Sequence, residues 1–186
     1  MINSIPNMLT LARIALIPVF VVIYYLPWEY SNLVCTVVYG LAGITDWLDG
    51  YLARRLNQSS ALGAFLDPVA DKLMVAVALI LLVEADPSPA LAIPAVIIIG
   101  REITISALRE WMAEVGARAT VAVSGIGKVK TVTQIVAITM LIYRDDFFGI
   151  PIYTTGYVLL YVAATLTIWS MVTYLRAAWP SLKAES

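Results

Sequence analysis

The sequence predicts an all-α integral membrane protein with six transmembrane helices, cytoplasmic N- and C-termini and a short N-terminal interfacial helix. Three observations predict this fold class. Of the 186 residues, 61% are hydrophobic and only 13% are charged, whereas a soluble domain is about half apolar and a quarter charged. Apolar runs recur along the whole chain, and the basic residues lie at alternate ends of these runs.

The apolar runs predict six spans in a single membrane-embedded domain that covers residues 1–186. A helix needs about 20 mostly apolar residues to cross the hydrocarbon core of a bilayer. Several runs reach that length only when polar residues extend their ends. The runs comprise residues 9–26, 33–45, 61–83, 91–100, 135–143 and 150–175.

The first residues predict the interfacial helix. Asn7, Thr10 and Arg13 are spaced by three and would form one polar stripe on a helix that precedes the first span. A polar end of the first span is the alternative. Since no basic residue precedes the apolar run and no small-residue cleavage site follows it, we expect no removable signal peptide.

The basic residues predict the orientation. With the N-terminus inside, the outer loops lie near residues 28–32, 84–89 and 144–149. Arg144 is then the only one of the 12 lysines and arginines outside, as the positive-inside rule requires. We therefore expect any site formed by the inner ends of the spans to face the cytoplasm.

The chain has no histidine and one cysteine, Cys35. Histidine-based catalysis, histidine zinc sites and intramolecular disulfides are therefore excluded. Any bound metal must be held by oxygen ligands.

Four aspartates lie at the inner ends of the second and third predicted spans. Asp46 and Asp49 are three residues apart, and Asp67 and Asp71 are four apart, so each pair shares a helix face. At a helical rise of about 1.5 Å per residue, Asp46 lies roughly 20 Å from residue 33, and Asp71 roughly 18 Å from residue 83. In an antiparallel hairpin Asp46 therefore faces Asp71.

This aspartate cluster predicts a divalent metal site. One aspartate within a span costs about 2.5–3.5 kcal/mol, so four unpaired ones would cost around 10 kcal/mol. Two Mg²⁺ or Mn²⁺ ions would neutralise them, and paired metals are a common device of phosphoryl chemistry. The alternative, ordinary ion pairs with Arg54, Arg55 and Lys72, explains one aspartate better than four in register.

The segment "DWLDGYLARRLNQSSALGAFLDPVAD" has the form DxxDGxxARx₈GxxxDxxxD and resembles the motif of the CDP-alcohol phosphatidyltransferase family. Its eight fixed positions are Asp46, Asp49, Gly50, Ala53, Arg54, Gly63, Asp67 and Asp71. The resemblance implies six spans, a homodimer, a cytoplasm-facing site, and attack of an acceptor hydroxyl on the lipid-side phosphorus of a CDP-linked substrate, which expels CMP.

The resemblance also implies roles for these positions. The four aspartates would hold two divalent metals, and Asp71 would act as general base. The CDP-binding positions would be Asp46, Gly50, Ala53, Arg54, Gly63 and Asp67.

Basic residues near the inner ends of later spans predict an anionic acceptor, since arginine and lysine bind phosphate oxygens. The candidates are Arg101, Arg109, Lys128 and Lys130, with Arg13 as a further headgroup contact. The stretches "IPNMLTLARIALIPV", "REITISALREWMAE" and "SGIGKVKT" resemble bacterial members of the family that use CDP-diacylglycerol and sn-glycerol 3-phosphate. This implies a location in the bacterial inner (cytoplasmic) membrane.

Other functions stay open at this point. Serine or inositol phosphate could replace glycerol 3-phosphate as acceptor. An ion-coupled transporter is a weaker alternative, because its charges would be distributed through the membrane depth or repeated in two halves. We expect the bilayer and the lipid substrates as partners, and no nucleic acid.

Overall fold

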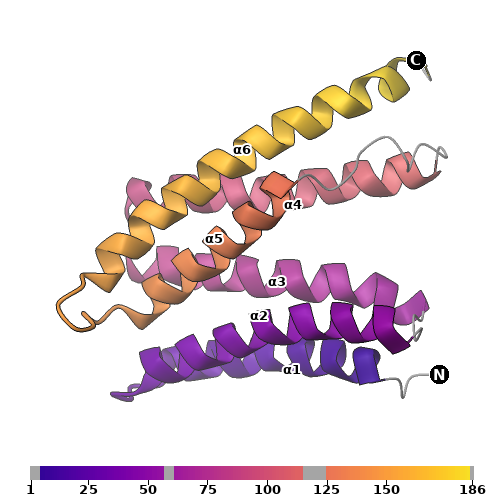
Figure 1. Cartoon of the computed structure of the whole chain (residues 1–186). Helices are drawn as coiled ribbons and strands as arrows, with labels where there is room; N and C mark the ends of the chain where they lie inside the picture. Colours follow the sequence, from indigo (N-terminus) through magenta and orange to yellow (C-terminus); the bar gives the residue numbers. More distant parts are fainter. Residues whose placement is uncertain (1–4, 57–60, 115–124, 185–186) are drawn as a thin grey trace.

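Six α-helices account for most of the residues that the structure, a computed structural model, describes, namely 5–56, 61–114 and 125–184 (Figure 1). Some helical side chains, including those of residues 46–56, 67 and 128, lie outside that description. The helices are α1 (Ile5–Tyr25), α2 (Ser31–Leu56), α3 (Ala61–Ala85), α4 (Pro89–Glu114), α5 (Gly125–Tyr143) and α6 (Ile152–Ala184). The prediction of an all-helical protein is confirmed.

Within the described residues, three helices contain segments long and apolar enough to cross a membrane: Met8–Tyr25, Pro89–Glu114 and Ile152–Trp179. Two shorter apolar segments, Ser31–Thr45 and Val129–Tyr143, belong to α2 and α5. The chain therefore has the character of a membrane protein. The number of spans and the side on which the termini lie stay predictions.

The N-terminal residues differ from the prediction. In the described residues α1 is continuous from Ile5 to Tyr25, so the separate interfacial helix is wrong there. Thr10 and Arg13 are each only 1% exposed. These two residues of the polar stripe therefore pack inside the protein and not at its lipid-facing surface.

Local backbone chemistry sets the helix boundaries. Helix α4 begins at Pro89, whose missing N–H costs nothing in the first turn, and the carbonyl of Ser88 accepts the first amide bonds of that helix. Helix α5 ends where Arg144 adopts a left-handed φ of 66°. Phe148 and Gly149 both have positive φ, as the central residues of a type I′ turn require. This turn leads into α6.

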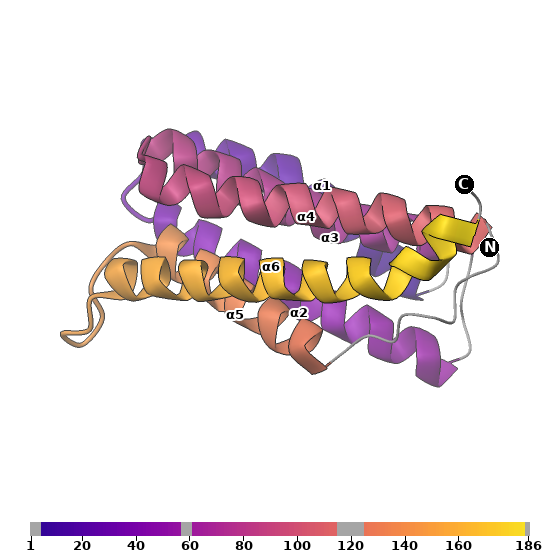
Figure 2. The same cartoon turned by 90° about the horizontal axis from the view of Figure 1, so that it is seen from above.

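The helices form two layers. Helices α1, α3 and α4 lie on one side, and α2, α5 and α6 on the other (Figure 2). The connections 26–30, 86–88 and 144–151 lie together at one end of the bundle, which we call the loop end (Figure 1). Helix α1 begins and α6 ends at the opposite end, which we call the terminal end.

The apolar core fills the half of the bundle nearer the loop end. Phe20, Cys35, Leu79, Leu91 and Leu160 are all fully buried there. Helices α5 and α6 approach closely at Gly156, where an added Cβ would lie 3.0 Å from side-chain atoms of α5. The half nearer the terminal end contains the buried polar side chains of Thr10, Arg13 and Lys130.

Asp86 links α6 to the connection between α3 and α4 at the loop end. Its Oδ2 accepts hydrogen bonds from the hydroxyls of Tyr157, at 2.5 Å, and Tyr153, at 2.9 Å, so the connection between α3 and α4 is fixed to α6. These hydrogen bonds, that from Tyr157 first, lower the pKa of the Asp86 carboxyl below its ordinary value.

Candidate active site

A polar cavity of about 280 Å³ lies between α3, α4 and α5 in the half nearer the terminal end. Four cationic and two acidic side chains line it, so these groups carry an excess of two positive charges. They are Asp71 and Lys72 from α3, Arg101, Glu102 and Arg109 from α4, and Lys130 from α5. Such a cavity suits a phosphorylated ligand.

Asp71 lies where this cavity meets a second, smaller one. The second cavity has a volume of about 20 Å³ and is lined by Arg13 from α1 and by Tyr39, Ala42 and Gly43 from α2, together with Asp71. That volume is enough for one water molecule. The carboxylate of Asp71 is thus accessible from the cationic cavity while its helix packs close to α1 and α2.

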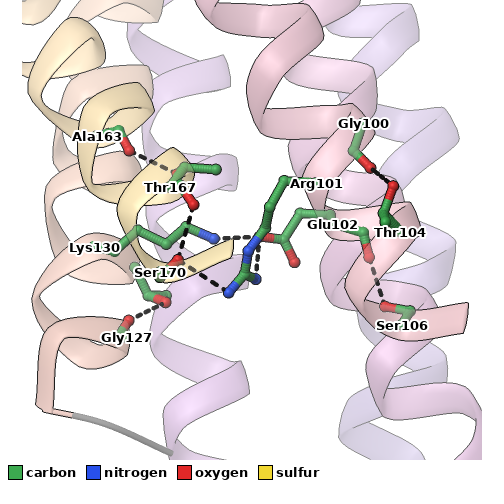
Figure 3. A network of polar contacts seen from close by, with 11 residues as sticks. Gly100, Arg101, Glu102, Thr104, Ser106, Gly127, Lys130, Ala163, Thr167 and Ser170 are labelled. Carbon is green, nitrogen blue, oxygen red and sulfur yellow. Dashed lines mark hydrogen bonds and ion pairs between the residues drawn. The ribbon is translucent and has the colours of Figure 1, made fainter. Parts of the chain in front are cut away.

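Glu102 joins the buried cations of the larger cavity (Figure 3). Its Oε1 accepts a hydrogen bond from Nζ of Lys130 and another, at 3.3 Å, from Nη1 of Arg101. Lys130 is only 4% exposed, and a buried charge of this kind needs a charged or hydrogen-bonding partner. The carboxylate of Glu102 on α4 therefore offsets the free-energy cost of burying the charge of Lys130 on α5.

Arg101 is held from its other side by α6. Its Nη2 donates a hydrogen bond to Oγ of Ser170, at 3.2 Å, and that hydroxyl donates to the carbonyl of Thr167, at 2.9 Å (Figure 3). Arg109 lies about two turns further along α4, with its guanidinium carbon 5.4 Å from the ring centre of Tyr174, a cation–π distance. Helix α6 thus positions both arginines.

The structure brings Asp71, Arg101, Arg109 and Lys130 around one cavity, and it places Arg13 beside the smaller one. Gly63 is buried in α3. The remaining predicted residues lie on described helices, but their side chains lie outside the description. They are Asp46, Asp49, Gly50, Ala53 and Arg54 on α2, Asp67 on α3 and Lys128 on α5.

Among the side chains that the structure describes, no cluster of three or more acidic, cysteine or histidine residues could hold a metal. Three of the four aspartates do not belong to that set. The smaller cavity places Ala42 and Gly43 beside Asp71, and Asp46 follows on the next turn of α2. Carboxylates are the donors that hard divalent cations prefer, and the set of four aspartates stays a prediction.

Sequence reasoning missed the roles of Glu102, Ser170 and Tyr39. An acidic residue next to Arg101 within an apolar helix was the available signal for Glu102, but its partner Lys130 is 28 residues away. The hydroxyl of Tyr39 is buried and has no hydrogen-bond partner among the described residues. Nothing local distinguishes Ser170 or Tyr39 from other residues of their helices.

Known proteins match nearly the whole chain. The family model described as CDP-alcohol phosphatidyltransferase matches residues 3–169. A protein of Yersinia pestis (strain Pestoides F) is 52% identical over 179 residues, which cover 96% of this chain and 97% of that protein. One from Salmonella paratyphi A is 53% identical over 175 residues, or 94% of each chain. Both carry the name CDP-diacylglycerol–glycerol-3-phosphate 3-phosphatidyltransferase.

Proposed function

The chain belongs to the CDP-alcohol phosphatidyltransferase family, and we propose that it transfers the phosphatidyl group of CDP-diacylglycerol to sn-glycerol 3-phosphate. The products are phosphatidylglycerophosphate and CMP. The names of relatives that align along almost its full length support this reaction. The observation that carries it is the cavity that joins Asp71 to three basic side chains, Arg101, Arg109 and Lys130.

The acceptor phosphate binds in the cationic part of the cavity. A phosphate monoester carries between −1.5 and −2 charges at neutral pH, which the excess of two positive charges lining the cavity balances. Glu102 already fixes Arg101 and Lys130 in position. Binding of the phosphate therefore loses little side-chain entropy. Lys128 adds a further cation on the same helix as Lys130.

The reacting hydroxyl of the acceptor points toward Asp71. Asp71 takes the hydroxyl proton while the oxygen forms a bond to the phosphorus nearest the lipid. The bond from that phosphorus to the bridging oxygen breaks, and the electron pair leaves with CMP. Holding both reactants in one cavity makes the step effectively unimolecular.

Two divalent cations, Mg²⁺ or Mn²⁺, would be held by Asp46, Asp49, Asp67 and Asp71. When bound, they supply neutralisation of the charge on the phosphate oxygens. Gly50, Ala53, Arg54 and Gly63 would line the CDP pocket between α2 and α3, where glycine and alanine leave room for a ligand against the backbone.

The chain would cross the bacterial inner membrane six times as a single domain, with the terminal end in the cytoplasm, and would pair as a homodimer. The distribution of lysine and arginine supports this orientation, which places the charged cavity on the cytoplasmic side. Arg13, which lines the smaller cavity beside Asp71, stays a candidate contact to the headgroup of a bound substrate.

The test is CMP release by the purified protein from CDP-diacylglycerol. Glycerol 3-phosphate, serine and inositol phosphate are offered separately, with Mg²⁺ or with EDTA. We expect release only with glycerol 3-phosphate and only with the metal. Release with another acceptor would keep the chemistry and overturn the assignment of the acceptor. If folded protein released no CMP with any acceptor, the proposed reaction would be wrong.

A further inference from the structure

We propose that Glu102 determines acceptor specificity by accepting a hydrogen bond from the acceptor's second hydroxyl, the one that does not attack. The inference rests on the proposed function, because it concerns the bound pose of glycerol 3-phosphate. It assigns to Glu102 a role in recognition beyond holding its two basic neighbours.

The carboxylate of Glu102 has acceptor capacity left over within the cavity. The hydrogen bonds from Lys130 and Arg101 both end on Oε1 (Figure 3). Oε2 accepts none from the residues that the structure describes. An ionised carboxylate offers about four acceptor positions and no donor. Since Glu102 lines the cavity together with Asp71, Oε2 is available to a hydroxyl on a ligand there.

A carboxylate in a phosphate-binding cavity otherwise acts against its ligand. Four cationic side chains would bind any phosphate, including inorganic phosphate and phosphates with no other polar group. Glu102 repels the phosphate, and the repulsion is offset only by a ligand that also carries a hydroxyl donor. Glycerol 3-phosphate carries two hydroxyls, of which one attacks and the other is free to donate.

An acceptor without the second hydroxyl leaves Oε2 desolvated and unsatisfied. Sites built around a buried polar group discriminate strongly against ligands that lack its partner. The alternative is that Glu102 only fixes Lys130 and Arg101. In that case its replacement would weaken all phosphate acceptors equally, whether or not they carry a second hydroxyl.

The experiment compares sn-glycerol 3-phosphate with 3-hydroxypropyl phosphate, which keeps the phosphate and the primary hydroxyl but lacks the secondary one. CMP release from CDP-diacylglycerol with Mg²⁺ gives kcat/KM for each acceptor. The full-length wild type is compared with Glu102→Gln, which keeps the shape and one neutral acceptor. Glu110→Gln, on an exposed position of the same helix, is the matched control.

We expect the wild type and Glu110→Gln to prefer glycerol 3-phosphate by about 10- to 100-fold, the range of a hydrogen bond to a charged group. Glu102→Gln should shrink that preference by about tenfold. A wild-type preference below about threefold, or an equal loss for both acceptors in Glu102→Gln, would overturn the proposal.

Two further outcomes are distinguishable. Thermal unfolding and the size-exclusion profile show whether Glu102→Gln folds. If it does not fold, Glu102→Asp replaces it in the comparison with the wild type. Shortening the side chain should also reduce the preference for glycerol 3-phosphate. If the wild type uses neither acceptor but releases CMP with serine or inositol phosphate, the assigned acceptor has failed and this inference falls with it.

Discussion

Replacing Lys130 by methionine tests the electrostatics of the acceptor pocket. Methionine fills a similar volume without the charge, and Lys130 is only 4% exposed, so the change acts inside the cavity. Losing one charge-assisted hydrogen bond to the acceptor phosphate costs about 1.5–3 kcal/mol. At 1.4 kcal/mol per factor of ten, the KM for glycerol 3-phosphate should rise roughly 10- to 150-fold. The KM for CDP-diacylglycerol should change far less.

The same variant should lose stability, for a separate reason. Removing one partner of a buried ion pair costs about 3–5 kcal/mol when the other charge is left alone. Here Arg101 stays 3.3 Å from Glu102, so we expect the lower end of that range. The double variant Lys130→Met/Glu102→Gln removes both charges of the buried pair and should recover part of the stability, because Arg101 loses its charged partner but keeps its hydrogen bond to Ser170. It should not recover the affinity for the acceptor.

Steady-state CMP release gives both KM values, and thermal unfolding in detergent gives the stability. Arg176→Met, on an exposed position of α6, controls for loss of a positive charge elsewhere. If the double variant regained the wild-type KM for glycerol 3-phosphate, Lys130 would serve only to neutralise Glu102. The assignment of Lys130 to the phosphate would then be refuted.

Five further variants test other parts of the structure. Asp71→Ala should abolish CMP release while the protein stays folded in detergent, and near-normal turnover would contradict its role. Lys128→Ala should raise the KM for glycerol 3-phosphate more than that for CDP-diacylglycerol, whereas equal effects would remove Lys128 from the acceptor pocket. Gly156→Ala should lower the thermal midpoint by about 2–12 °C, since overpacking costs about 1–3 kcal/mol and its Cβ would meet α5 at 3.0 Å. Gly100→Ala, where nothing lies within 4 Å, should not lower the midpoint. Because the pKa of Asp86 is lowered by hydrogen bonds from tyrosine hydroxyls, its contribution to stability is present above about pH 4 and is lost as the pH falls through the lowered pKa. Unfolding of Asp86→Asn should therefore depend less on pH in that acidic range, and an unchanged pH profile would count against the contribution.

Local spacing was sufficient for several conclusions. Apolar composition and run length predicted an all-helical membrane protein, because a chain in lipid must satisfy its own backbone hydrogen bonds. The intervals between Asp46, Asp49, Asp67 and Asp71 placed each pair on one helix face, because side-chain direction follows from the helical repeat alone. The same spacing carried the resemblance to the family that the chain proved to belong to.

The sequence was less informative about which faces of the helices meet. In a membrane, lipid and protein interior are equally apolar, so the pattern of apolar residues does not show which side of a helix is buried. That is why the polar stripe with Thr10 and Arg13 was assigned to the membrane interface, although both side chains are buried in the protein.

Only the tertiary structure decided how the acceptor pocket is assembled. Lys130 meets Glu102 across 28 residues of sequence, and Arg101 meets Ser170 across 69. No local periodicity relates residues so far apart, because their contact depends on the packing of α4 against α6 and on the position of α5 beside them. The sequence by itself predicted the chemistry of the aspartate motif and determined that basic residues lie near the inner ends of the later apolar runs. The packing of three helices determined that a carboxylate lies among those basic residues and that they share a cavity with Asp71.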